Sequence, residues 1–141
     1  MFVATDRLGS DREFWWDELE RLVLLAPRLP DVLTVRIDEV DRRWVLGRAA
    51  CDVPRGDDGW TVECDATPTA RHRAYRDLCV ALRPLGRSER EGVLDSLAAA
   101  TGQSRVGRAT HRAVSRTELA RVASEGVLDV GAHTASHPAL A

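Results

Sequence analysis

Lysine is absent from this chain, so every one of its 20 basic residues is an arginine. The arginines are dispersed among 22 acidic residues, and the formal net charge is -2. A chain with this balance creates no field that would draw it to nucleic acid or to an anionic membrane. We therefore expect no nucleic-acid partner and no electrostatic binding to membranes.

Long apolar runs are also absent. No stretch approaches the roughly 18 apolar residues that a membrane-spanning helix needs. The first residues lack the basic and apolar segments of a signal peptide, so we expect neither a membrane span nor a signal peptide in residues 1–141. A cytoplasmic location and an association with the cell envelope are both compatible with this. The length suits one domain with a substantial core and is short for two.

Cysteine is scarce: the chain has Cys51, Cys64 and Cys79, with no Cys-x-x-Cys spacing. An odd number of cysteines in a chain of this length argues against a disulfide framework. We expect reduced thiols that pack as small apolar side chains. No feature of the sequence indicates a cysteine nucleophile.

The residues best suited to chemistry lie at the end of the chain, where His133 and His137 are four positions apart. They follow the apolar run 127–130 and the pair Gly131-Ala132, so the pattern predicts a strand over 127–131 that ends at the histidines. α/β folds gather their chemistry at this end of a strand, and two imidazoles at this spacing reach one metal ion. On spacing alone, two solvated histidines at a frayed terminus are an equal alternative.

The residues around the histidines form a more specific pattern. The segment that starts at Ser115-Arg116-Thr117-Glu118 leads into Gly131-Ala132-His133-Thr134-Ala135-Ser136-His137-Pro138. It closely resembles the second conserved block of the polysaccharide deacetylase family, the NodB homology domain of carbohydrate esterase family 4. In that family a short helix leads into a strand that ends in Gly-x-His-[Ser/Thr]-x-x-His-Pro, and both histidines bind a divalent metal. The resemblance implies that His133 and His137 are metal ligands, with zinc the expected ion.

The start of the chain is similar to the same family. Residues 1–9 resemble its second strand and the following loop, and residues 14–20 resemble an insertion found in a bacterial subset. The family's first block, Thr-Phe-Asp-Asp-Gly, supplies the catalytic base and the third metal ligand, and neither it nor the later blocks occur in residues 1–141. The resemblance therefore implies an internal fragment, with no catalytic residue of its own and an incomplete metal site.

An Asp-Asp-Gly sequence does occur at 57–59, but Val53-Pro54-Arg55 precedes it in place of a buried strand. An acidic pair flanked by proline and glycine is typical of a turn. We therefore do not expect Asp57 or Asp58 to replace the missing base.

The function that the resemblance implies is hydrolysis of N- or O-acetyl groups on an acetylated polysaccharide or cell-envelope glycan. Such an enzyme is a metal-dependent hydrolase of carbon–nitrogen bonds other than peptide bonds. Without the aspartate base, we expect residues 1–141 to be inactive alone. Two alternatives are a non-catalytic carbohydrate-binding remnant that uses Trp15, Trp16 or Trp44, and a helical protein-interaction module whose histidines have no role. The sequence does not determine the glycan, the metal or the oligomeric state.

The predicted fold is α/β, a part of the distorted (β/α) barrel of polysaccharide deacetylases. Residues 1–9 and 115–141 are expected to be barrel segments of one truncated domain. Residues 10–114 are expected to form an inserted subdomain of helices and a β-hairpin. This insertion contains all four tryptophans, so we expect it to hold most of the buried apolar surface.

Local signals predict the individual elements. Ser-x-x-Glu capping boxes at Ser10, Ser88 and Ser115 predict helices over 10–26, 88–100 and 115–124, and periodicity predicts another over 70–83. Alternating residues predict a hairpin of 32–37 with 43–46, and a short strand over 60–64.

Side-chain positions follow from the same helical periodicity. In the last helix, Leu119, Val122 and Ala123 are expected to face inward. The polar residues expected at the surface are His72, His111, Asp17, Glu18 and Glu20. One of Trp15 and Trp16 is expected in the core.

Overall fold

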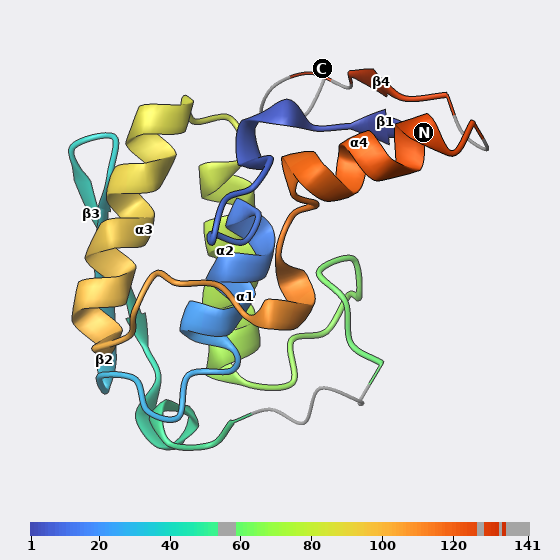
Figure 1. The fold of residues 1–141 in the computed structure, drawn as a ribbon. Coiled ribbons are helices and arrows are strands. Elements are labelled where there is room, and N and C mark those ends of the chain that lie inside the picture. The colour runs from blue at the N-terminus through green and yellow to red at the C-terminus, as the bar shows by residue number, and fades with distance from the viewer. Residues whose placement is uncertain (54–58, 127–128, 133, 135–141) are drawn as a thin grey trace. The chain divides into compact units, whose positions relative to one another are not determined.

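The computed structural model describes residues 1–53, 59–126, 129–132 and 134. The chain divides into two compact units. The middle unit is Trp15–Arg105, and the terminal unit joins Met1–Phe14 to Val106–Ala141 (Figure 1). The middle unit lies within the predicted insertion, 10–114, and the terminal unit contains both predicted barrel segments. None of the helices in the described ranges is long and apolar enough to cross a membrane.

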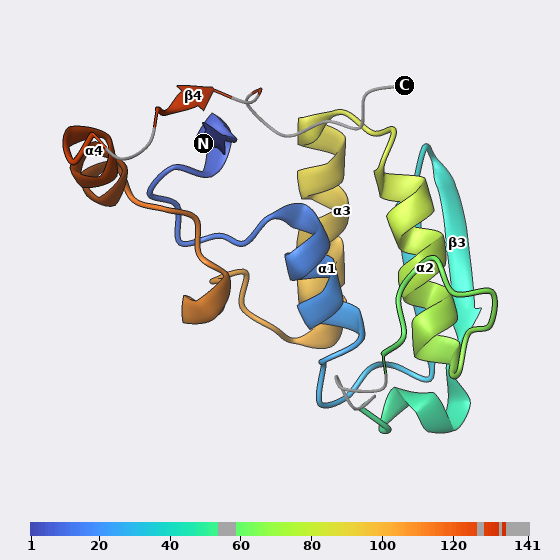
Figure 2. The same cartoon turned by 90° about the vertical axis from the view of Figure 1, so that its right-hand side faces the viewer.

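The middle unit combines three helices with one β-hairpin. Its elements are α1 (Trp15–Val23), β2 (Val32–Ile37), β3 (Val40–Val45), the 3₁₀ turn η2 (Gly47–Ala50), α2 (Ala70–Leu82) and α3 (Arg87–Thr101). Helix α3 packs against β2 and α2 against β3, while α1 packs against both of these helices (Figure 2). The arrangement encloses an apolar core between the hairpin and the helices.

The core of the middle unit follows from the periodicity of its sequence. Alternation along β2 turns Leu33, Val35 and Ile37 inward, and each is almost completely buried. The helices contribute residues at helical spacing, among them Leu19, Leu22, Leu78, Leu82, Leu94 and Leu97. All buried apolar residues in the described part of the chain lie between Leu19 and Ala98. The expectation that the insertion holds most of the apolar core is confirmed.

The hairpin is confirmed, and its second strand starts earlier than predicted. The two strands are antiparallel, with Ile37 opposite Val40 and Val32 opposite Val45. The two-residue turn between them has a φ of 51° at Asp38 and of 62° at Glu39. Positive φ at both turn positions matches the twist of the strands, and it brings β3 directly back along β2.

The predicted strand over 60–64 is wrong, because this segment forms a turn. The amide of Cys64 donates a hydrogen bond to the carbonyl of Thr61 at 3.1 Å. The amide of Thr61 in turn donates to the Cys64 thiol at 3.3 Å. These local hydrogen bonds replace the ladder that a strand needs, even though the residues favour a strand by composition.

Helix α1 begins at Trp15, whereas the sequence pattern predicts a start at Ser10. Ser10 does not cap the helix, because its Oγ accepts a hydrogen bond from the Arg12 amide at 3.0 Å. Glu13 Oε1 accepts a hydrogen bond from the backbone amide of Arg108 at 2.8 Å. The two residues of the predicted capping box therefore bind other partners.

The starts of α2 and α3 show where the local sequence pattern predicts the first residue of a helix correctly and where it does not. Thr69 caps α2, which agrees with the predicted helix over 70–83. Helix α3 starts after Gly86 with Glu89 as its capping partner, so the predicted box at Ser88 is wrong. Its predicted end at Gly102 is confirmed, with a left-handed φ of 65° that glycine adopts without strain.

The terminal unit contains short elements: β1 (Phe2–Val3), the 3₁₀ turns η1 (Thr5–Arg7) and η3 (Ala109–His111), α4 (Arg116–Ser124) and β4 (Gly131–Ala132). The predicted capping box at Ser115 is confirmed. The Oγ of Ser115 accepts a hydrogen bond from the Glu118 amide at 3.1 Å, and Oε2 of Glu118 accepts one from the Ser115 amide at 2.8 Å. Helix α4 has no fully buried residue; of the positions expected to face inward, Leu119 and Val122 are half-buried and Ala123 is exposed. It makes no extensive contact with another described helix or strand.

Of the predicted strand over 127–131, Gly131 is the one residue that is a strand in the described part of the chain. Strand β4 comprises Gly131 and Ala132 and pairs in parallel with β1. Asp129 and Val130 have an irregular backbone, and residues 127–128 lie outside the described residues. A strand does precede the histidine motif, but in the described chain it begins at Gly131.

Candidate functional site

The predicted metal ligands, His133 and His137, lie outside the described residues. The rejected alternatives Asp57 and Asp58 also lie outside them. The structure describes the residues that lead to the histidine motif, namely Gly131-Ala132, together with Thr134 directly after His133. The geometry of the candidate site is therefore that of its supporting strands.

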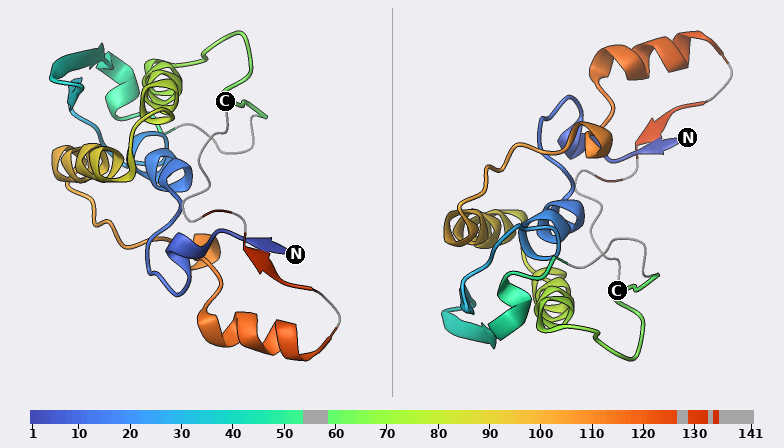
Figure 3. Two further views of the ribbon diagram at one scale, coloured as in Figure 1. Left: turned by 90° about the horizontal axis from the view of Figure 1, so that it is seen from above. Right: turned by 90° about the horizontal axis from the view of Figure 1, so that it is seen from below.

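Strands β1 and β4 lie side by side although more than a hundred residues separate them in sequence (Figure 3). The Gly131 amide donates to the Met1 carbonyl at 2.9 Å. The amide of Thr5, just after β1, donates to the Thr134 carbonyl at 3.2 Å. Because the strands are parallel, the residues that follow β4 and those that follow β1 emerge at the same edge. In α/β proteins that edge is where ligands bind.

Two backbone features define the last described part of β4. A Cβ on Gly131 would lie 3.0 Å from Cε1 of Phe2. Any larger residue at position 131 would therefore require the Phe2 ring to move. Thr134 has a φ of 56°, a left-handed conformation that costs free energy in a β-branched residue. Strain of this kind is characteristic of functional sites, and here it lies directly beside a predicted metal ligand.

The approach to α4 is stabilised by an ion pair. The two guanidinium NH groups of Arg112 donate to the two carboxylate oxygens of Glu118 at 2.8 and 2.6 Å. Hydrogen bonds from Arg112, and then from Ser115, lower the pKa of Glu118 well below its ordinary range. The start of this helix is therefore held by an ionised carboxylate, as the helix dipole favours.

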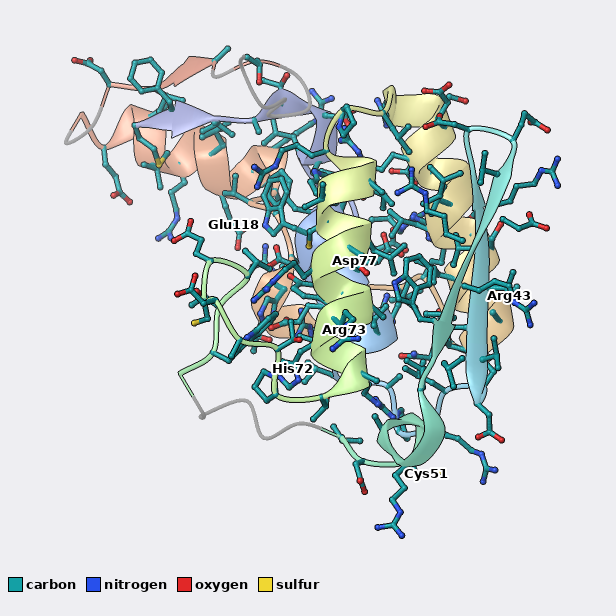
Figure 4. All side chains as sticks on the ribbon, turned by 180° about the vertical axis from the view of Figure 1, so that it is seen from behind. Arg43, Cys51, His72, Arg73, Asp77 and Glu118 are labelled. Atoms are coloured by element: carbon teal, nitrogen blue, oxygen red, sulfur yellow. The ribbon has the colours of Figure 1, made fainter. Side chains whose placement is uncertain are left out.

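His72 was expected at the surface, and the structure shows that it is buried. Only 3% of the residue is exposed. Its Nδ1 lies 2.8 Å from Oγ1 of Thr69, and its ring packs edge-on against Trp60 with centroids 4.5 Å apart. His72 lies near the start of α2 (Figure 4). These contacts identify a packed structural histidine. His111 is half-exposed.

Glu18 was expected on the solvated side of α1, and this expectation is also wrong. Its side chain is 0% exposed. Arg105 donates to its two oxygens at 2.7 and 2.9 Å, and it also contacts Glu91 at 2.9 Å and Asp95 at 2.5 Å. A buried carboxylate persists only with such partners. Asp17, on the same helix, is half-buried.

Arg71 is a buried cation that the sequence did not reveal. The residue is 0% exposed, and burial lowers the pKa of its guanidinium. Its N–H groups donate to backbone carbonyls at and just after the end of α1 and in η2, those of Val23, Leu24, Ala26, Ala49 and Ala50. The side chain therefore joins two backbone segments by their carbonyls, which a helix end leaves without partners. We assign it a structural role.

The three cysteines are free thiols, as expected, but only Cys79 is buried, and Cys51 is exposed in place of the expected packing. Trp15 packs against the core, and the guanidinium carbon of Arg90 lies 4.9 Å from its ring centroid. The Trp15 and Trp16 rings meet edge-on with centroids 5.6 Å apart. Neither geometry favours a sugar-stacking platform at this pair.

The described residues contain no group of three or more His, Cys, Asp or Glu side chains that could hold a metal ion. No family model, curated protein or solved structure matches the chain. The resemblance to polysaccharide deacetylases therefore stays a prediction from the sequence motif alone.

Proposed function

We propose that this chain is part of a metal-dependent carbohydrate deacetylase, in which His133 and His137 bind a divalent metal, with zinc the expected ion. The observation that supports this most is the parallel pairing of β1 with β4. It accompanies a hydrogen bond of 3.2 Å from the amide of Thr5, after β1, to the carbonyl of Thr134, after β4, at the edge where parallel sheets bind ligands. The histidine motif begins directly after Ala132.

We further propose that β1 and β4 are neighbouring strands of a larger α/β sheet, the partial (β/α) barrel. Strands of parallel sheets are normally covered on both faces. Phe2 is nevertheless 76% exposed and Met1 47% exposed. Apolar residues this exposed on a parallel pair favour further elements that pack against them in the complete fold.

Two histidines do not complete a catalytic metal site, because catalytic zinc normally has three protein ligands. A metal in a complete site acidifies a bound water and polarises the acetyl carbonyl. The third ligand and the general base are expected from a sequence block that residues 1–141 do not contain. The contribution of this chain is to present two imidazoles at the edge of the sheet.

Acetate release tests the proposal. We expect no measurable release by residues 1–141 from acetylated oligosaccharides, and metal-dependent release by a longer polypeptide that adds the Asp-Asp block and the later blocks. In that longer protein, His133→Ala or His137→Ala should lower kcat/KM by about a thousandfold or more, because a lost metal ligand removes the Lewis acid. His111→Ala is the matched control, with an expected change below about twofold. Full activity after His133→Ala would refute the proposed role.

A further inference from the structure

Strand β3 has an open edge, because β2 and β3 form a two-stranded sheet in which β3 pairs with β2 on one side only. The hydrogen bonds to β2 continue past the end of β3, where the Leu46 amide donates to the Asp31 carbonyl at 2.8 Å. In an antiparallel pair, residues that exchange hydrogen bonds alternate with residues whose N–H and C=O groups point away from the partner. Asp41, Arg43 and Val45 therefore present their backbone groups on the open edge of β3.

The open edge has no backbone partner in the described part of the chain. None of Asp41, Arg43 and Val45 makes a backbone hydrogen bond with a described residue outside the hairpin, and all three are exposed. The six residues of β3 pair with β2 without a bulge, and none of them is a proline. A regular edge of this kind is a template for pairing with another strand.

The side chains along the open edge alternate in charge. Asp41 and Arg43 lie on the outer face of the hairpin, because they pair with Arg36 and Thr34, which alternate along β2 with the buried Val35. Figure 4 shows Arg43 on the side of the hairpin away from α2. Arg43 makes no ion pair with a described residue, and the side chain of Asp41 is 57% exposed beside Arg36. The edge thus offers one carboxylate and one guanidinium to a neighbouring strand.

This alternation makes the edge complementary to a second copy of itself. An antiparallel pair of identical strands is symmetric, so the residue at its centre determines which side chains meet. With Arg42 at the centre, Asp41 of each copy lies directly opposite Arg43 of the other, and opposite charges in this position stabilise a sheet. With Asp41 or Arg43 at the centre, that residue would face its own copy, and like charges directly opposite are destabilising. Of these three registers, only the one centred on Arg42 pairs opposite charges within β3.

The core side of β3 favours the same register. It brings Val40, which is 59% exposed, opposite Trp44 of the second copy. Trp44 lines a surface hollow together with Val80, which is 69% exposed, so the added strand would cover apolar surface. Arg42 would meet its own copy at the centre. Asp77 lines the same hollow as Arg42, and its carboxylate offsets the repulsion between the two guanidinium groups.

We propose that two copies of this chain pair through the open edges of β3, antiparallel and centred on Arg42, to form one four-stranded sheet. Backbone hydrogen bonds between Asp41 of one copy and Arg43 of the other join the strands, and the two ion pairs fix the register. An interface of one strand pair is small, so we expect a dissociation constant on the order of 10–100 μM. The inference does not rest on the deacetylase proposal, because β3 belongs to the middle unit and the histidine motif to the terminal unit.

The test is sedimentation of residues 1–141 and of two charge variants, from about 5 to about 500 μM, to span the expected dissociation constant. Asp41→Arg places arginine at both edge positions, and Arg43→Asp places aspartate at both. Each variant therefore repels its own copy, whereas an equimolar mixture of the two pairs opposite charges again. The control Arg28→Asp makes the same charge change as Arg43→Asp at an exposed position in the loop before β2. The NMR spectrum of each variant establishes that it is folded.

We expect the unchanged chain and Arg28→Asp to dimerise with affinities that agree within about twofold. Asp41→Arg and Arg43→Asp should each dimerise at least about tenfold more weakly alone, because like charges replace opposite charges at two positions. Their mixture should recover the affinity of the unchanged chain within about threefold. An unchanged chain that stays monomeric throughout, an affinity that either variant leaves unchanged, or two folded variants that do not associate when mixed would each overturn the inference.

Hydrogen exchange on the unchanged chain tests the edge without any substitution. The amides of Asp41 and Arg43 should exchange more slowly as the protein concentration rises, because they donate to the second copy in the dimer. The amide of Arg42 already faces β2, so its exchange should change much less with concentration. Exchange at Asp41 and Arg43 that is independent of concentration while the chain dimerises would place the interface elsewhere and contradict the proposal.

Discussion

The middle and terminal units are stabilised by different means. The middle unit contains every buried apolar residue of the described chain. The terminal unit relies on polar contacts, such as the ion pair of Arg108 with Glu13 at 2.6 Å, while its Phe2 side chain is largely exposed. The difference shows that the inserted segment has the core of an independent folding unit. The segments that resemble an enzyme lack such a core in the described residues.

This contrast separates folding from function within one chain. The unit with the strongest folding signals contains no predicted metal ligand. The unit that contains the histidine motif has strands of two residues each. Two short parallel strands stabilise each other little by their pairing alone, because a parallel sheet is stabilised mainly by the elements that cover its faces. The comparison therefore supports the proposal that the terminal unit belongs to a larger sheet.

The largest expected effect tests the middle unit at Arg71. Arg71→Ala should lower the free energy of unfolding by about 4 kcal/mol, because several buried carbonyls lose the guanidinium that donates to them. Denaturant unfolding followed by tryptophan fluorescence measures this change. Arg73→Ala removes an exposed arginine from the same helix and should cost less than about 0.5 kcal/mol. Equal effects of the two substitutions would show that the carbonyl contacts do not stabilise the unit.

Hydrogen exchange tests the comparison directly. The amide of Leu94, inside α3, should be protected by the full stability of the middle unit. The amide of Gly131 donates to Met1 between two short strands, so it should exchange at least about tenfold faster. Slower exchange at Gly131 than at Leu94 would contradict the proposed difference between the units.

The smallest expected effect concerns pH and the start of α4. In the folded chain the pKa of Glu118 is lowered from its ordinary value of 4.5. The ionised carboxylate therefore contributes fully to stability above pH 4.5, and this contribution is lost as the pH falls through the lowered pKa of the folded state. Backbone chemical shifts of α4 should therefore report loss of helix only in strong acid. Glu118→Gln should reduce helix content at neutral pH and remove this acid transition. An unchanged transition in Glu118→Gln would assign it to another group.

The sequence predicted the elements whose signals are local. The Ser115 capping box, the helix that starts after Thr69 and the strand over 32–37 each depend on residues within a few positions. Two of the failures, both near the start of α1, depend on distant partners, whereas those at 60–64 and at Ser88 reflect competing local hydrogen bonds. Glu13 binds Arg108 and does not complete the predicted capping box at Ser10. Glu18 binds Arg105 and does not occupy its predicted solvated position.

The candidate sites show the same limit. The histidine motif was found because its spacing and flanks are contiguous in sequence. The hydrogen bond of Trp44 to Asp77 was not predicted, because it forms only when α2 packs against the hairpin. Arg71 likewise looked like one of many dispersed arginines, and only the fold reveals the carbonyls of Val23 and Ala49 around it.

Zinc binding to residues 1–141, followed by the imidazole signals in NMR, tests the central claim most directly. The account predicts that zinc shifts the signals of His133 and His137 together and leaves those of His72 and His111 in place. Either His133→Ala or His137→Ala should weaken zinc binding at least about tenfold, because one imidazole then remains. Zinc binding of unchanged affinity in His133→Ala, or a shift confined to His111, would contradict the proposed metal site.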